Sequence, residues 1–192
     1  PAGYQLVAAL GDEHATARAE MLAALDSPRY RALVERLADA VRLPLPTPSA
    51  TQAQPELADL VRAEAGRLRK ALRRAGPDPE DAVLHALRIR GKRVRYTGEL
   101  ALAGLRGTRT GRTVKKLLAA TAELQEVLGD HQDACVAEQR IRQLLDGLGE
   151  LPPAEVVFVG GRLVERERAR ARRQRSLWWA AWERVDELIG KL

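Results

Sequence analysis

Apolar residues recur at steps of three and four along most of the chain, and this spacing constrains the fold more than any other feature. Such spacing places apolar side chains on one face of an α-helix, whereas a half-buried strand needs strict alternation. Aromatic residues make up only 4% of the 192 residues, and Val, Ile and Thr are scattered among Ala, Leu, Arg and Glu. This mixture favours helices over strands. We therefore expect an all-α protein.

Proline and glycine divide this pattern into six expected helices. The first two cover residues 3–25 and 28–41, and a proline-rich stretch, residues 44–55, follows them. Proline removes a backbone donor and disfavours helix in the residue before it, so this stretch is interpreted as a linker. The remaining helices are expected at residues 56–75, 79–105, 112–147 and 154–190.

The linker divides the chain into two expected parts. Short loops join the last four helices, so residues 56–192 are expected to form an antiparallel four-helix bundle. The two helices in residues 1–43 cannot bury their apolar faces alone, and we interpret them as the tail of an incomplete first bundle. The presence of Pro1 in place of Met agrees with a fragment or a processed chain.

Several classes of protein are disfavoured by the composition. The sequence has no run of eighteen apolar residues and no signal peptide, so we expect no membrane partner. The single cysteine, Cys135, excludes an internal disulfide and a cysteine-rich zinc site. It also fits a reducing compartment, and we expect a cytoplasmic location.

Positive charge is concentrated in two stretches of the sequence. Residues 62–116 contain 16 basic and 5 acidic side chains, and residues 162–175 contain 7 basic and 2 acidic ones. The rest of the chain carries 9 basic and 19 acidic side chains, so the net charge of +6 conceals a strong asymmetry. A basic surface on an otherwise acidic protein indicates a polyanionic partner.

One expected helix carries a row of cations beside its apolar face. At about 100° per residue, several polar side chains between residues 85 and 99 fall within one arc of about 100°. Like charges in such a row repel each other unless acids or a bound anion neutralise them. The alternative is a solvated basic face whose stems cover hydrophobic surface. The side chains in this arc are His85, Arg88, Lys92, Arg95, Tyr96 and Glu99.

The last expected helix has arginines where its apolar stripe should continue. The stripe that includes Leu163 and Leu177 passes through Arg166 or Glu167 and then Arg170. Buried charge without a partner is costly, so either acids from elsewhere pair with these arginines or they line an anion-filled groove. Two further cations flank the apolar faces of their helices, Arg173 here and Lys116 in the preceding helix.

Two segments resemble the signatures of a known family. LHALRIRGKRVRYTGE at residues 84–99 and LQEVLGDHQDA at residues 124–134 are similar to those of the CHAD family, the conserved histidine α-helical domain. The resemblance extends over essentially the whole chain, because residues 8–41 are similar to the last part of the family's first repeat. It implies two related four-helix bundles with a basic surface between them, and binding of inorganic polyphosphate. It also implies association with polyphosphate granules and a fused or docked triphosphate-processing domain, as in some members of the family.

The resemblance also gives an expectation about the family's first repeat. The family's first repeat opens with its own His/Arg-rich helix, and no such segment precedes Pro1. We therefore expect binding to be weakened, or to need a missing segment or a second copy of the chain. The resemblance further implies which residues bind phosphate. The matched motif gives as phosphate contacts His85, Arg88, Lys92 and Arg95, with Tyr96 as a flanking packing residue. The helical phases add four less directly matched cations, Lys116, Arg166, Arg170 and Arg173.

The expected function is non-catalytic binding of polyphosphate, with no cofactor and no metal. An alternative is an RNA- or DNA-binding helical domain, although aromatic residues are not interleaved with the cations. A second alternative is a helical scaffold that docks a partner protein. An enzyme would have to use Asp130, His131 and Asp133 as metal ligands, but Gly129 and Asp130 are better explained as a helix bend.

Overall fold

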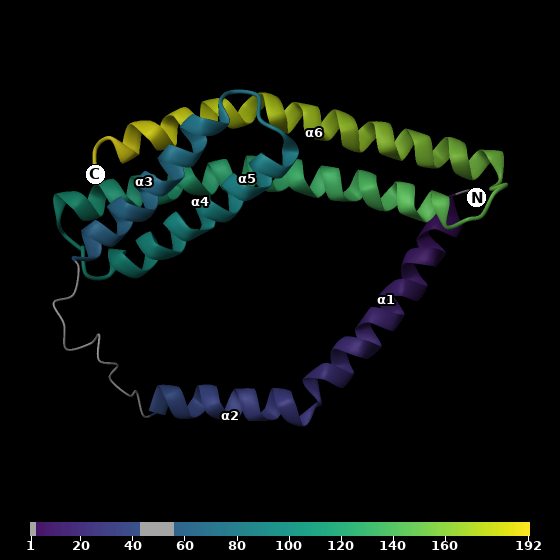
Figure 1. Ribbon diagram of the computed structural model, residues 1–192, viewed down its shortest axis with the longest axis horizontal. Helices are drawn as coiled ribbons and strands as arrows, with labels where there is room; N and C mark the ends of the chain where they lie inside the picture. The colour runs from purple at the N-terminus through teal and green to yellow at the C-terminus, as the bar shows by residue number, and fades with distance from the viewer. Residues whose placement is uncertain (1–2, 43–55) are drawn as a thin grey trace. The chain divides into compact units, whose positions relative to one another are not determined.

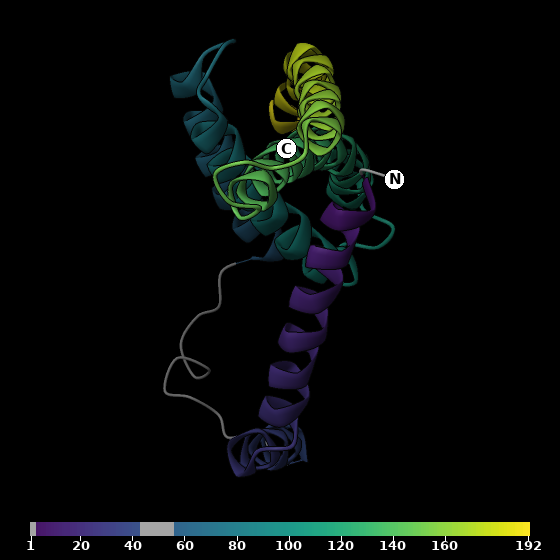
Figure 2. The same cartoon turned by 90° about the vertical axis from the view of Figure 1, so that its right-hand side faces the viewer.

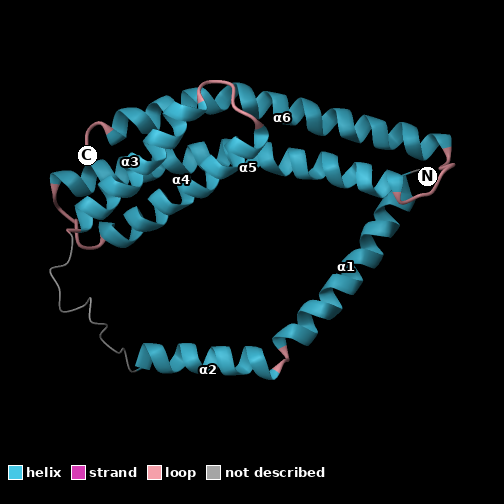
Figure 3. Cartoon of the chain, in the orientation of Figure 1, coloured by secondary structure: helices cyan, strands magenta, loops and turns pink. Residues whose placement is uncertain are grey.

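The computed structural model describes residues 3–42 and 56–192, and these ranges contain six α-helices and no strand (Figures 1 and 3). The all-α class is confirmed, whereas the expected linker lies outside the described residues. Within these ranges, none of the helices combines the length and the hydrophobicity needed to cross a membrane. The helices are α1 Gly3–Leu25, α2 Pro28–Arg42, α3 Leu57–Ala75, α4 Asp81–Leu102, α5 Arg109–Asp146 and α6 Ala154–Ile189.

The chain forms two compact units. The first consists of residues 1–54 with residues 143–160, and the second of residues 55–142 with residues 161–192. In the first unit, Ser27 begins α2 by accepting a hydrogen bond from the Tyr30 backbone N–H at 3.2 Å. No described side chain of α2 is buried. The expected domain boundaries stay a prediction.

The second unit has a well-defined apolar core. All four of its helices contribute side chains, but Leu177, expected on the inward stripe of α6, is 46% exposed and lies outside the core. The core includes Val61, Leu68 and Leu72 of α3, Leu84, Leu87 and Val94 of α4, Leu117, Leu124 and Leu128 of α5, and Trp178, Trp182 and Val185 of α6.

The helix boundaries differ from the expected ones at a few points. The helix α5 begins at Arg109 rather than at residue 112, because Thr108 Oγ1 accepts a hydrogen bond from the Gly111 N–H at 2.9 Å and caps the helix. The helix α4 begins at Asp81 and ends at Leu102, so it is shorter than the expected range. Each correction concerns a local cap or turn, and the order of the helices is unaffected.

Two side-chain contacts join helices of the second unit, one between α4 and α5 and one between α3 and α6. Figure 2 shows the ribbon of these helices from a second side. A Cβ atom on Gly98 of α4 would lie 2.7 Å from Leu118 Cδ2, so glycine allows α4 and α5 to approach closely there. Arg69 of α3 donates from Nε to Asp186 Oδ1 of α6 at 2.5 Å. This hydrogen bond is the main cause that holds the pKa of Asp186 below its ordinary value.

Candidate functional site

Four polar side chains of α4 form a row that we call the α4 stripe: His85, Arg88, Lys92 and Arg95. All four are half-buried, and their neighbours Leu84, Leu87 and Val94 belong to the core. The expected position of these cations beside the apolar face of the helix is thus confirmed, because they do not extend fully into solvent. Their aliphatic stems lie beside the core, and their charged ends remain partly accessible.

Several buried nitrogens of the stripe have no hydrogen-bond partner among the described residues. They are His85 Nδ1, Arg88 Nε and Arg95 Nε. Arg88 lies against α5 at Gly129, where a Cβ atom would be 3.5 Å from Arg88 Nε. The two arginine nitrogens are donors, and a buried donor without a hydrogen bond costs about 1–3 kcal/mol, so these two positions favour an anion that supplies oxygen acceptors.

Gln125 of α5 holds one end of the stripe. Its Oε1 accepts a hydrogen bond from Arg95 NH1 at 3.0 Å. The residue is only 8% exposed, and its Nε2 also lacks a partner among the described residues. Sequence reasoning did not select Gln125, although a polar residue beside the buried Leu124 on the inner side of α5 was a usable signal.

The stripe is only partly neutralised by acids. Arg95 Nε lies 3.3 Å from Glu99 Oε1, close enough for an ion pair but without the geometry of a hydrogen bond. Arg88 and Lys92 form no ion pair with any described residue. Two of the three permanent cations therefore retain uncompensated charge.

Tyr96 flanks the stripe without being buried. Its side chain is among the exposed large apolar groups, with 54% of the residue's surface accessible. The guanidinium carbon of Arg95 lies 5.1 Å from the centre of the tyrosine ring, a cation–π contact. Tyr96 therefore restrains Arg95 from the solvent side.

The predicted arginines of α6 differ from the α4 stripe. Arg166 is exposed and lies 3.3 Å from Glu167 Oε1, and Arg170 donates to Asp130 Oδ1 at 3.0 Å. The buried residue on this part of α6 is Glu167, at 6% exposure. Of the two alternatives open from the sequence, the structure shows ion pairing for Arg166 and Arg170. Arg173 is exposed and forms no ion pair with a described residue.

Lys116 lies in a different basic cluster. With Arg109 and Arg112 it lines a cavity of about 270 Å³ near the start of α5. It is exposed, and in the described part of the chain it makes no hydrogen bond or ion pair with the α4 stripe. The structure thus does not join Lys116 to the stripe by a direct contact.

The possible metal ligands near Gly129 are not brought together as the sequence alternative required. Asp130 accepts hydrogen bonds from Arg170 and Gln174, and Asp133 is exposed. His131 is 3% exposed and instead faces Asp81, with Nε2 3.3 Å from Oδ1. Burial is the main cause that lowers the pKa of His131 below its ordinary value.

Cys135 lies one turn after His131 on α5. It is half-buried, and its Sγ lies 3.7 Å from Asp81 Oδ2. Burial, followed by the charge of Asp81, raises the pKa of this thiol to about 11.

Comparison with known proteins identifies the family. A model of the CHAD domain family matches residues 1–142, which include both signature segments. Two mycobacterial proteins, uncharacterized protein MT2285 of Mycobacterium tuberculosis (strain CDC 1551 / Oshkosh) and uncharacterized protein Rv2226 of strain ATCC 25618 / H37Rv, are each 29% identical to the chain over 174 residues. The alignments cover 88% of this chain and 31% of each relative, so the chain spans about a third of the length of the curated relatives it matches. No solved structure matches the chain significantly. Because the family model matches well over half of its residues, the chain belongs to the CHAD domain family.

Proposed function

We propose that this domain binds inorganic polyphosphate without catalysing a reaction, and that the α4 stripe contacts the phosphates. The observation that carries the proposal is the pair of buried guanidinium nitrogens, Arg88 Nε and Arg95 Nε, which donate no hydrogen bond to any described residue. Phosphate oxygens would provide both the missing acceptors and the compensating charge.

The geometry of the stripe suits a linear polyanion. His85 and Arg95 are ten residues apart on one helix, which corresponds to about 15 Å at ~1.5 Å per residue. Polyphosphate has no bases or side groups, so recognition depends on charge density and on hydrogen-bond donors. Arginine offers forked donors, lysine a point charge, and histidine a charge that increases as the pH falls.

The other predicted cations take secondary places in this proposal. Arg166 and Arg170 already pair with acids, so their contribution to anion binding is reduced. Arg173 and Lys116 are exposed and could contact a longer chain of phosphates. Targeting to polyphosphate granules and a fused or docked triphosphate-processing domain belong to the same proposal and rest on the family resemblance.

A charge-matched pair of variants tests the role of the stripe. The first replaces Arg88, Lys92 and Arg95 with glutamine, and the control makes the same substitution at Arg90→Gln, Arg93→Gln and Lys115→Gln. The control residues are exposed, and two of them lie on the same helix. Both variants lose three positive charges, so a difference between them reports position rather than net charge.

Binding to long-chain polyphosphate is measured by titration, with circular dichroism to establish that each variant keeps its helices. We expect the stripe variant to lose binding and the control to retain most of it. Undiminished binding in the stripe variant, or equal losses in both variants, would contradict the proposal.

Nucleic acid remains the second candidate because Tyr96 is an exposed aromatic ring beside a cation. Base stacking on such a ring is typical of single-stranded nucleic-acid binding. Competition between polyphosphate and an oligonucleotide at matched salt separates the two functions. Preferential displacement of polyphosphate by the oligonucleotide would favour nucleic acid.

A further inference from the structure

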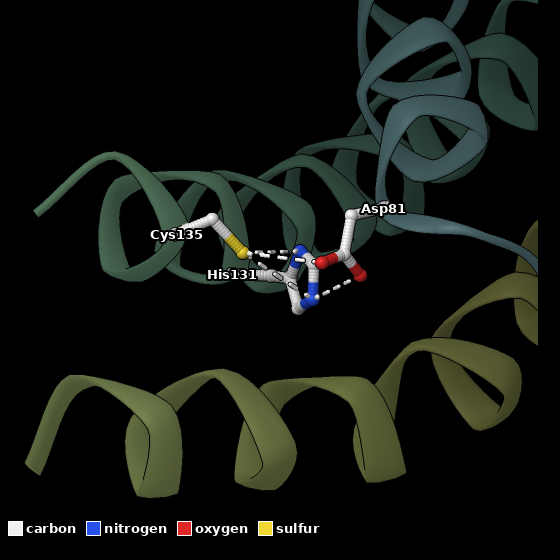
Figure 4. A group of neighbouring side chains, drawn as sticks. All are labelled: Asp81, His131 and Cys135. Carbon is white, nitrogen blue, oxygen red and sulfur yellow. Dashed lines mark hydrogen bonds and ion pairs between the residues drawn. The ribbon is translucent and has the colours of Figure 1, made fainter. Parts of the chain in front are cut away.

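Three side chains with metal-binding groups converge beside α6 in the second unit (Figure 4). Asp81 is the first residue of α4, and His131 and Cys135 lie one turn apart on α5. Each offers one ligand atom, and these atoms all lie within 4.8 Å of one another. The group shares no residue with the α4 stripe.

The distances between the ligand atoms fit a tetrahedral site. Metal–nitrogen and metal–oxygen bonds of about 2.0 Å and a metal–sulfur bond of about 2.3 Å give edges of about 3.3 Å for N–O and about 3.5 Å for S–O and S–N. The structure has His131 Nε2 3.3 Å from Asp81 Oδ1. Cys135 Sγ is 3.7 Å from Asp81 Oδ2 and 3.9 Å from His131 Nε2. The two distances to Asp81 involve different carboxylate oxygens, so the carboxylate has to turn to present a single oxygen to both other ligands. Because all three ligand atoms already lie within 4.8 Å of one another, this rotation together with small shifts would close the site around a cation.

The surroundings hold the carboxylate in place and leave space for a fourth ligand. Arg175 donates to Asp81 Oδ1 at 2.7 Å, which leaves Oδ2 facing Cys135. Such an outer hydrogen bond orients a metal-binding carboxylate. The three side chains also line a cavity of about 280 Å³, together with Arg168 and Arg172.

The set of donors determines the class of metal. One imidazole nitrogen, one sulfur and one carboxylate oxygen suit a borderline-soft divalent cation, whereas Mg²⁺ and Ca²⁺ prefer oxygen ligands alone. His131 is only 3% exposed, so its ring is fixed by packing rather than free to turn into solvent. A fixed histidine reduces the entropy lost when a metal binds.

We propose that Asp81, His131 and Cys135 bind a divalent cation of the Zn²⁺ class, with one coordination position open toward the cavity. This assignment replaces the sequence expectation of no metal. It stands independently of polyphosphate binding, because it rests on different side chains.

Cobalt binding to the whole 192-residue chain tests the site. Cys135 is the only cysteine, so a thiolate-to-cobalt charge-transfer band in the near ultraviolet reports this residue alone. The protein is freed of metal, titrated with Co²⁺, and then titrated with Zn²⁺ in competition. The variants are Cys135→Ser and Asp81→Asn, and His14→Gln is the matched control because His14 is an exposed histidine on α1.

We expect the band in the unmodified chain and in the control, and its loss in Cys135→Ser. Asp81 is exposed, so Asp81→Asn should keep the fold and weaken Zn²⁺ binding at least about tenfold. Absence of the band from the unmodified chain would overturn the proposal. Zn²⁺ affinity unchanged in Asp81→Asn would also overturn it, because the carboxylate would then not be a ligand.

Discussion

Replacement of Gln125 with glutamate tests how the stripe handles charge. The two side chains have nearly the same shape, and a carboxylate can accept the hydrogen bond that Arg95 NH1 now donates to Oε1 at 3.0 Å. The variant therefore keeps the position of Arg95 but adds a negative charge beside it. If Arg95 binds phosphate, this charge competes for the guanidinium and repels the ligand.

The size of the effect follows from the geometry. A phosphate oxygen bonded to Arg95 lies about 2.8 Å from the guanidinium, so the phosphate and the new carboxylate would be about 6 Å apart. At an effective dielectric constant of about 20, Coulomb's law gives about 2.8 kcal/mol of repulsion. Partial exposure of Arg95 screens part of it, so we expect a loss of about 1–3 kcal/mol, or about 5- to 150-fold in affinity.

A neutral companion variant separates charge from positioning. Gln125→Leu removes the acceptor for Arg95 without adding charge. The loss of this one hydrogen bond, which positions Arg95, should cost about 1 kcal/mol of binding free energy, or about fivefold in affinity for polyphosphate. Calorimetric titration with long-chain polyphosphate at fixed salt should rank the unmodified chain first, Gln125→Leu second and Gln125→Glu last. A natively helical Gln125→Glu variant that binds as tightly as the unmodified chain would refute the reasoning.

Two further predictions concern salt and pH. Three permanent cations in contact with phosphate should contribute about −2 to the slope of log K, the binding constant for polyphosphate, against log salt, at about 0.7 per contact. The stripe variant should therefore show a slope that is flatter by about 2 between about 50 and 200 mM salt. An equal slope in both proteins would contradict the stripe as the phosphate contact. Asp186 has a pKa lowered mainly by the hydrogen bond from Arg69, so its stabilising contribution is present above its unfolded pKa of about 3.9 and is lost as the pH falls through the lower folded pKa. Urea unfolding should therefore show a difference in unfolding free energy between the unmodified chain and Asp186→Asn that shrinks below about pH 4, and a constant difference would argue against the pKa shift.

The helices could be predicted from the sequence because strong local signals mark their ends. Pro28 follows the capping residue Ser27, and Gly76 adopts φ of 71° directly after α3. The start of α5 was misplaced because Thr108 was not identified as its cap. That error came from a side-chain hydrogen bond, which the apolar spacing does not reveal.

The site was predictable only where one helix contains it. The α4 stripe spans ten residues, so a small error in helical phase does not move its members to another face. On the longer α6, the phase drifts over many turns, and the expected inward residue Leu177 is 46% exposed while Trp178 is 1% exposed. The contacts of Asp81 with His131 and Cys135 join two helices and have no local signal in the sequence.

The contrast between α4 and α6 depends on where the acids lie. On α6, Glu167 lies beside Arg166 and one turn before Arg170, and Asp130 of α5 completes the pairing. On α4, Glu99 is the only acid between residues 82 and 105, and it lies eleven residues from Arg88, about 16 Å along the helix. That separation is about twice the screening length of about 8 Å at physiological salt, so Glu99 compensates Arg95 but not Arg88. Charge compensation by an external anion is therefore more favourable at Arg88 of α4 than at Arg166 or Arg170 of α6, even though α6 contains more arginines.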